Sequence, residues 1–120
     1  MPFWLFVLSA WQSAGTPAQC QARLETYARD GMLTVTGYCR NLQPTAAHIR
    51  YEMALQRESA GGHSRNTQRG EVNVAPQQEV ALSQTRVNAD PKGAYRVYLR
   101  VFDAEGHTLA QDSVLQTPTR

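Results

Sequence analysis

The sequence predicts an all-β protein, an immunoglobulin-like β-sandwich of about seven short antiparallel strands. Hydrophobic and polar residues alternate along most of the chain, which is the pattern of strands with one buried face. Turn signals separate these runs at the spacing typical of a sandwich. After residue 19 no stretch has the periodicity of a helix. The expected strands are Cys20–Tyr27, Met32–Arg40, His48–Arg57, Glu71–Val74, Glu79–Val87, Ala94–Asp103 and His107–Leu115.

The N-terminal segment has the pattern of an export signal. It begins with the apolar run MPFWLFVLSAW, and small residues follow, which suit cleavage after Gly15 or Ala18. The run is too short to span a bilayer as a helix. No basic residue precedes it, and the alternative is a buried N-terminal strand or helix. We expect a signal peptide over residues 1–18, a folded domain over 19–116, a frayed tail over 117–120, and export without a membrane anchor.

The first two strands flank Asp30-Gly31, a strong hairpin signal because glycine accepts positive φ. The register that we expect pairs Tyr27 with Met32. Carried along the hairpin, it places Cys20 opposite Cys39, and opposed strand residues lie within the roughly 7 Å between Cα atoms that a disulfide allows. In an oxidising compartment we therefore predict a disulfide between Cys20 and Cys39, with two free thiols as the alternative. Without a Cys-x-x-Cys motif, a redox role is not favoured.

The stretch Ala47–Leu82 is the centre of the predicted sheet. Its first third alternates strictly between hydrophobic and polar residues, as a strand with one buried face does. The segment His63–Arg69 is polar and has no buried stripe, so we interpret it as an edge strand or a surface loop. Alternation resumes around Pro76 and leads into the next strand.

Ala94–Asp103 is the most regular strand in the sequence, and a turn ending at Gly106 joins it to the last strand. One face is hydrophobic. The other face carries Arg96, Tyr98, Arg100 and Phe102. Aromatic and guanidinium groups that alternate on an exposed sheet face are typical of a contact surface. The alternative is a solvated face whose aromatic rings are partly covered by a loop or a neighbouring strand.

Residue types found in catalytic and metal sites are present, but not in the patterns that such sites need. The three histidines lie in different turns or strand ends, whereas zinc requires three or four convergent ligands. Ser64 follows His63 without a nucleophile elbow or an evident acid partner. Asp103 and Glu105 belong to the turn that ends at Gly106, so we interpret them as turn residues. We expect no enzymatic activity, no cofactor and no metal site.

Charge is nearly balanced, with twelve basic and ten acidic residues and a net charge of +2. The basic residues are almost all arginine, and they are scattered along the chain rather than clustered. Nucleic-acid binding usually requires a denser basic patch. We therefore expect no nucleic-acid partner.

Several short motifs lie between Tyr51 and Val114. They are Leu55-Gln-Arg57-x-Ser59, Gly62-x-Ser64-x-x-x-Gln68-x-Gly70, Pro76 before Val80-Ala-Leu82, Tyr95-Arg-Val97-x-Leu99 and Asp103-x-x-Gly106. In these motifs the chain resembles the small periplasmic curli proteins of the CsgC/CsgH type, over most of Cys20–Val114. The CsgC branch has a Cys-x-Cys pair, whereas the cysteines here are far apart, so the CsgH branch is nearer.

The resemblance implies an immunoglobulin-like sandwich and a periplasmic chaperone that holds back amyloid polymerisation of curli subunits before secretion. The implied partner is a curlin-type subunit, and we expect a monomer. Amyloid grows through unpaired strand edges and Gln/Asn ladders, so a transient inhibitor needs weak polar contacts. Guanidinium groups supply such contacts. The candidates are Arg65, Arg69, Arg96 and Arg100, with Tyr98 and Phe102 beside them.

An edge strand near Ser64–Gln68 offers direct pairing with the client as a second mode of contact. We favour the charged sheet face, because charge usually blunts the edges of soluble sheets. The alternative function is an exported immunoglobulin-like binding or adhesive module with a folded partner.

Overall fold

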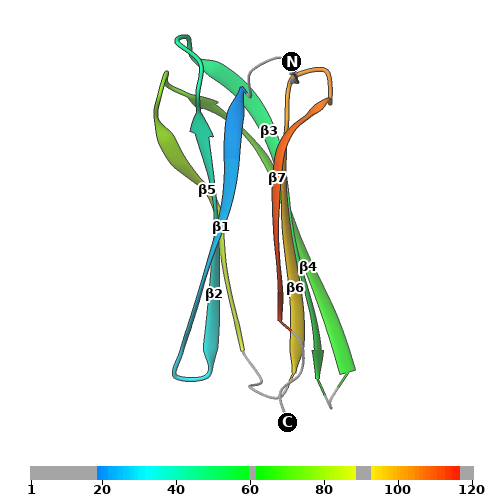
Figure 1. Ribbon diagram of the computed structural model, residues 1–120. Helices are drawn as coiled ribbons and strands as arrows, with labels where there is room; N and C mark the ends of the chain where they lie inside the picture. Colours follow the sequence, from blue (N-terminus) through cyan, green and yellow to red (C-terminus); the bar gives the residue numbers. More distant parts are fainter. Residues whose placement is uncertain (1–18, 60–61, 89–92, 117–120) are drawn as a thin grey trace, which may run out of the picture.

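The computed structural model describes residues 19–59, 62–88 and 93–116, which form seven antiparallel strands (Figure 1). The predicted signal peptide over 1–18 and the tail over 117–120 lie outside the described residues. None of the described residues forms a helix that could cross a membrane. The strands are β1 (Cys20–Arg29), β2 (Met32–Asn41), β3 (Ala47–Ser59), β4 (Gly62–Val74), β5 (Glu79–Asn88), β6 (Ala94–Phe102) and β7 (Thr108–Gln116).

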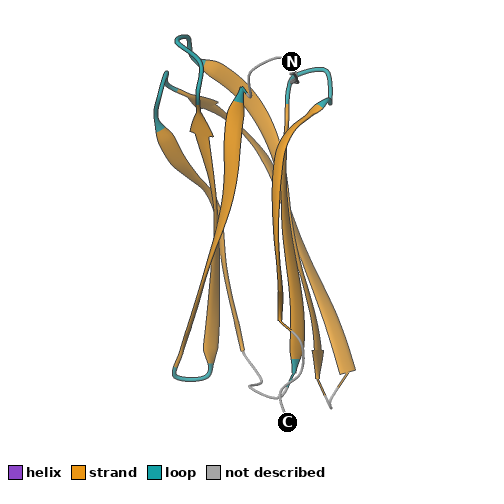
Figure 2. Ribbon diagram, in the orientation of Figure 1, coloured by secondary structure: helices purple, strands orange, loops and turns teal. Residues whose placement is uncertain are grey.

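The strands make two sheets that face each other, one with the order β1-β2-β5 and the other with the order β4-β3-β6-β7. In the described part of the chain only turns and loops connect the strands (Figure 2). The all-β sandwich predicted from the alternating pattern is confirmed.

The first hairpin turns where the sequence predicts but in a different register. Arg29 pairs with Met32, two residues away from the predicted Tyr27–Met32 pairing. Asp30 and Gly31 have φ values of 53° and 75°, and two central residues with positive φ are what a two-residue hairpin turn of the favoured hand requires. The loop is therefore two residues long, and the residues before Asp30 belong to the strand.

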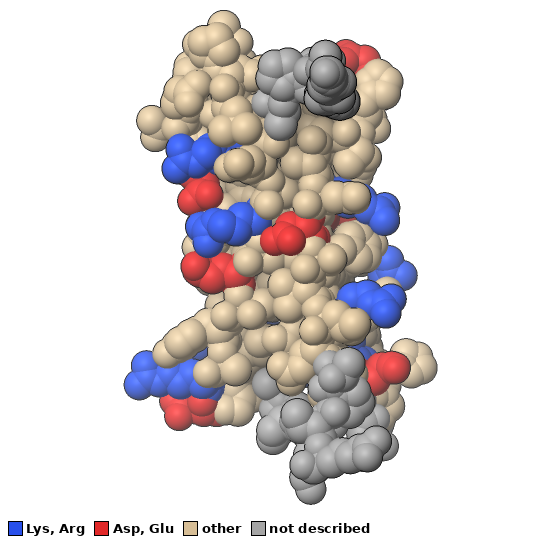
Figure 3. Space-filling view, in the orientation of Figure 1, with Lys and Arg blue, Asp and Glu red and all other residues tan. Residues whose placement is uncertain are grey.

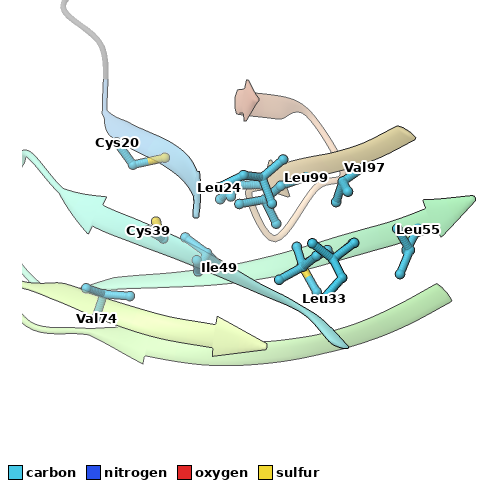
Figure 4. Close-up of a cluster of buried hydrophobic side chains, with 12 residues drawn as sticks. Cys20, Leu24, Leu33, Cys39, Ile49, Leu55, Val74, Val97 and Leu99 are labelled. Atoms are coloured by element: carbon cyan, nitrogen blue, oxygen red, sulfur yellow. The ribbon is translucent and has the colours of Figure 1, made fainter. Parts of the chain in front are cut away.

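This register makes the predicted disulfide wrong. Cys20 faces Asn41, and Cys39 faces Ala22, so the two cysteines are diagonal rather than opposed. Both are buried free thiols (Figure 4). A hydrogen bond from Cys39 lowers the pKa of the Cys20 thiol. The same bond, with burial, raises the pKa of Cys39.

β4 is a single long strand where the sequence predicts an edge strand or loop followed by a short strand. It pairs with β3 without interruption, from Gly62 opposite Ser59 to Val74 opposite Ala47. It lies at the edge of the four-stranded sheet, so the edge-strand interpretation of His63–Arg69 is confirmed. Its first half is exposed on both faces, and only its C-terminal half covers the core.

The core fills the space between the inner faces of the two sheets (Figure 4). Alternate residues of every strand except the exposed half of β4 contribute to it, as period-two patterning requires. Its largest fully buried hydrophobic side chains are Leu33, Val35, Ile49, Met53, Val74, Val97, Leu99 and Val101.

Along one side of the sandwich, β1 and β7 lie next to each other. The carboxylate of Asp112 in β7 accepts a hydrogen bond of 2.9 Å from the backbone N–H of Leu24 in β1. An edge strand normally leaves such an N–H group unpaired. Here a side chain from the other sheet satisfies it, and this contact joins the two sheets.

Along the other side, β4 and β5 approach each other over a shorter length. The side-chain amide of Gln68 donates to the hydroxyl of Thr85. Farther along, the guanidinium of Arg57 in β3 donates to the backbone carbonyl of Asn88. Side-chain hydrogen bonds therefore bridge the sheets on this side.

Candidate contact surface on the four-stranded sheet

β6 has the two faces that its sequence predicts. Val97, Leu99 and Val101 are fully buried in the core. On the opposite face, Arg96 and Arg100 are exposed and the aromatic residues between and after them are half-buried. The outer face of the four-stranded sheet therefore presents guanidinium groups beside partly covered rings.

β3 lies between β4 and β6, and its register aligns the arginines of those two strands. Gln56 pairs with both Arg65 and Arg96. Glu52 pairs with both Arg69 and Arg100. We call this surface the arginine face. Its members are Arg65, Arg69, Arg96, Tyr98, Arg100 and Phe102.

Tyr98 lies at the centre of the arginine face and is held by two arginines. The guanidinium of Arg65 donates to its hydroxyl at 3.1 Å, across the width of β3. The guanidinium of Arg100 lies 4.9 Å from the centre of its ring, a cation–π contact. Beneath this arrangement, Ala54 on the same face of β3 is fully buried. Tyr98 therefore covers the middle of the sheet, and its polar contacts fix it there.

The arginines of this face differ in their ionic partners. Arg69 forms an ion pair with Glu52, at 2.7 Å from Nη2 to Oε2. In the part of the chain that the structure describes, no carboxylate lies within ion-pair distance of Arg65, Arg96 or Arg100. Three guanidinium groups in β4 and β6, the strands on either side of β3, thus keep their charge uncompensated.

On the outer face of the three-stranded sheet, one arginine is paired with two carboxylates. Arg23 forms ion pairs with Glu25 at 3.2 Å and with Glu79 at 3.1 Å, and it stacks 4.2 Å from the ring of Tyr38. Hydrogen bonding to Arg23 holds the pKa of Glu79 below its ordinary value. Basic side chains gather at both margins of the view in Figure 3, where the two outer faces are seen edge-on. Arg40 and Arg86 on the three-stranded sheet, like Arg65, Arg96 and Arg100 on the other, have no ion pair among the described residues.

Two shallow hollows lie on the four-stranded sheet. The first, of about 530 Å³, is over β6 and β7 and brings basic and amide side chains together. The second, of about 520 Å³, lies toward the β6–β7 turn and contains Phe102. Lining residues of the first hollow include Gln56, Arg96, Tyr98, Arg100 and Gln111.

Ser64 and Gln68 lie apart from the arginine face. They alternate in β4 with Arg65 and Arg69, so their side chains project from the opposite side of the sheet. Gln68 points to the other sheet and bonds Thr85, while Ser64 is exposed. Period-two alternation in the sequence is enough to separate these residues from the two arginines.

The carboxylate of Asp103 accepts hydrogen bonds from residues of the turn in which it lies. Its Oδ1 accepts 2.9 Å hydrogen bonds from the backbone N–H groups of Glu105 and His107. The bond from the His107 backbone is the main reason why the pKa of Asp103 is lowered. This is the turn arrangement that the sequence indicates.

Gln56 and Gln111 are members of the hollow that the sequence did not single out. Each begins a short polar run near one end of its strand or in its middle, and no local feature marks it. Cross-strand register alone brings them together with Arg96 and Arg100.

No protein-family model matches the sequence, and comparison with curated proteins gives no significant match. Among solved structures, the chain is similar to CsgH of R. palustris, with a TM-score of 0.63 and 21% identity over 79% of this chain and 90% of that one. It is also similar to the E. coli curli protein CsgC, with a TM-score of 0.65 and 18% identity over 78% of this chain and 96% of that one. This chain has the CsgC/CsgH fold.

The expected resemblance to the CsgC/CsgH type is thus confirmed in the fold. A β-glucuronidase of Bacteroides uniformis also matches, with a TM-score of 0.59 and 15% identity over 83% of this chain. The match covers 14% of the enzyme chain, so the similarity is to a small part of that protein. It gives no support for enzymatic activity in the CsgC/CsgH-like chain.

Proposed function

We propose that this protein is a periplasmic chaperone that delays amyloid polymerisation of curlin-type subunits before their secretion. The observation that carries the proposal is the arginine face, where Arg65, Arg96 and Arg100 have no carboxylate partner among the described residues. Charge-assisted hydrogen bonds from these groups reach backbone carbonyls, carboxylates and amides of an extended client. Exposed contacts of this kind are individually weak, which suits a transient inhibitor.

The shape of the surface agrees with transient binding. Both hollows on this face are shallow and lined in part by charged side chains. A stable complex usually has well-packed, fully desolvated anchors at its centre. On the arginine face, Tyr98 and Phe102 are half-buried, so only part of each ring is available to a partner.

The likeness in fold to the curli protein CsgC suggests the class of client. The apolar segment followed by small residues at the N-terminus supports export and a periplasmic location. In this proposal the protein acts as a monomer, and the arginine face meets the client directly.

The test is fibrillation of the organism's own curlin subunit, followed by thioflavin-T fluorescence, with this protein added well below equimolar ratio. We expect a longer lag. Arg96→Gln with Arg100→Gln should remove most of that effect. The matched control is Arg29→Gln with Arg86→Gln, which removes the same charge from exposed positions on the three-stranded sheet.

An unchanged lag at equimolar ratio would refute the chaperone function and favour an exported binding module with a folded partner. Equal loss of activity in the two double variants would show that net charge, rather than the arginine face, is responsible.

A further inference from the structure

We infer that the hollow over β6 and β7 binds the side-chain carboxylate of an extended polypeptide segment, and that Gln56 and Gln111 bind amide side chains next to that carboxylate. The inference rests on the proposed function for the choice of an extended polypeptide as the partner. Its chemical specificity comes from the lining of the hollow, in which Arg96 and Arg100 stand beside the two glutamines.

The first argument is charge complementarity. Arg96 and Arg100 both line the hollow, and neither has a carboxylate partner among the residues that the structure describes. Guanidinium groups match the planar carboxylate with two parallel N–H donors. Four residues apart on one strand, the two Cα atoms are roughly 13 Å apart. This spacing lets both side chains lean toward a carboxylate placed over Tyr98.

The second argument is that one donor is already in position. Arg100 lies with its guanidinium 4.9 Å from the ring centre of Tyr98, and the hydroxyl of Tyr98 is held by Arg65. A cation–π contact engages the flat side of a guanidinium and leaves N–H donors at its edge. Because Arg100 is already ordered, binding costs less side-chain entropy than it would for a free arginine.

The acidic residue in the lining does not cancel this charge. Asp112 uses Oδ2 to accept from the backbone N–H of Leu24 and Oδ1 to accept from the backbone N–H of Ser113. It forms no ion pair with a described arginine. Both oxygens of Asp112 therefore accept backbone hydrogen bonds, and the guanidinium groups of Arg96 and Arg100 remain available to a partner.

The third argument concerns the amides. Gln56 pairs with Arg96 from the β3 side, and Gln111 pairs with Arg100 from the β7 side. Neither glutamine side chain makes a hydrogen bond to another described residue. Each amide offers both a donor and an acceptor, as the amides of asparagine and glutamine in a client do. In an extended segment, residues at i and i+2 face the same side, so amides two residues before and after an acidic residue fit the two glutamines.

The probe is a capped synthetic peptide with the central sequence Gln-Gly-Asp-Gly-Gln, compared with two relatives. One replaces Asp by Asn and the other replaces both Gln by Ala. Binding is followed by NMR titration of the 15N-labelled protein, including the arginine Nε–H signals. We expect the Asp peptide to shift the signals of Arg96 and Arg100 and to bind most tightly, and each relative to bind several-fold more weakly.

Arg96→Gln with Arg100→Gln should weaken binding of the Asp peptide on the order of tenfold, because each exposed charged contact contributes a few-fold. The control Arg29→Gln with Arg86→Gln should bind as the unaltered protein does. Equal affinity for the Asp and Asn peptides, or shifts confined to β1, β2 and β5, would overturn the carboxylate site. Equal affinity for the Ala peptide would overturn the role of the glutamines.

The peptide experiment tests the carboxylate site, and the fibrillation assay tests the proposed function, so either proposal can be refuted without the other. A protein that lengthens the lag but does not distinguish the peptides keeps its proposed function and loses this site. A protein that distinguishes the peptides but leaves the lag unchanged keeps the site and loses the curli function.

Discussion

Replacing Gly70 by alanine puts a methyl group where the ring of Tyr51 lies. The two residues are directly opposite each other in β4 and β3. A β-carbon at Gly70 would be 2.5 Å from Oη and 2.7 Å from Cζ of Tyr51, closer than non-bonded atoms approach. The ring, which packs against the core, must therefore move.

The expected change in the free energy of unfolding is the difference between two opposing effects. Overpacking of this kind costs about 1–3 kcal/mol. Alanine also restricts the unfolded chain, which offsets about 0.4–1 kcal/mol. We expect Gly70→Ala to lower the free energy of unfolding by about 1–2 kcal/mol, measured by urea denaturation.

A double-mutant cycle with Tyr51→Ala isolates the cause. Without the ring, Gly70→Ala should cost nothing or stabilise the protein slightly. A Gly70→Ala variant as stable as the unaltered protein, or a cost that persists in the Tyr51→Ala background, would refute the close approach between ring and strand.

Three further changes test other parts of the molecule. Leu99→Ala empties a fully buried site and should lower the free energy of unfolding by about 2–5 kcal/mol in chemical denaturation. Asp112→Ala leaves the N–H of Leu24 without its acceptor and should cost about 1–3 kcal/mol, whereas Asp112→Asn keeps an acceptor oxygen and should cost less. Equal losses would contradict a hydrogen-bonding role. Because Arg23 lowers the pKa of Glu79, their pair stabilises the fold above the ordinary glutamate pKa, and this contribution is lost as pH falls through the lowered value. Glu79→Gln should therefore reduce the acid dependence of stability, and an unaltered dependence would argue against this coupling.

The faces of β6 were predictable because alternation is a local property of the sequence. Each of Arg96, Tyr98 and Arg100 is separated from the next by a buried hydrophobic residue, and the structure keeps that order. The same rule applied to β4 separates Ser64 and Gln68 from the arginines. Where one strand decides which way a side chain points, the sequence is sufficient.

The first hairpin register was missed although its signal was present. Asp-Gly is typical of both central positions of a two-residue turn, which makes Arg29 and Met32 the first pair. A four-residue loop was assumed instead, and that assumption brought Cys20 opposite Cys39. An error of two residues leaves the buried face unchanged, so hydrophobic patterning does not reveal it.

The sequence indicates the candidate residues of the arginine face, but not that β4 and β6 bring them onto one surface. The contact of Arg65 with Tyr98 joins residues 33 positions apart and depends on β3 lying between β4 and β6. No local pattern determines which strands share a sheet or in what order. The pairing of Arg69 with Glu52, which leaves the other arginines uncompensated, depends on the same arrangement.

The hydrogen bond from Leu24 to Asp112 makes one side of the sandwich more firmly joined than the other. In spatial order the strands run β5-β2-β1 and then β7-β6-β3-β4, and β1 and β7 join the two sheets at one side. β4 and β5 lie at the opposite side, where they approach each other over a shorter length and two side-chain hydrogen bonds bridge the sheets. Thermal opening of the sandwich should begin at β4 and β5, and the backbone amides of these two strands should exchange with deuterated water sooner than the amide of Leu24. The arginine face lies on the outer side of the four-stranded sheet, so such opening between the two sheets leaves it accessible to a partner.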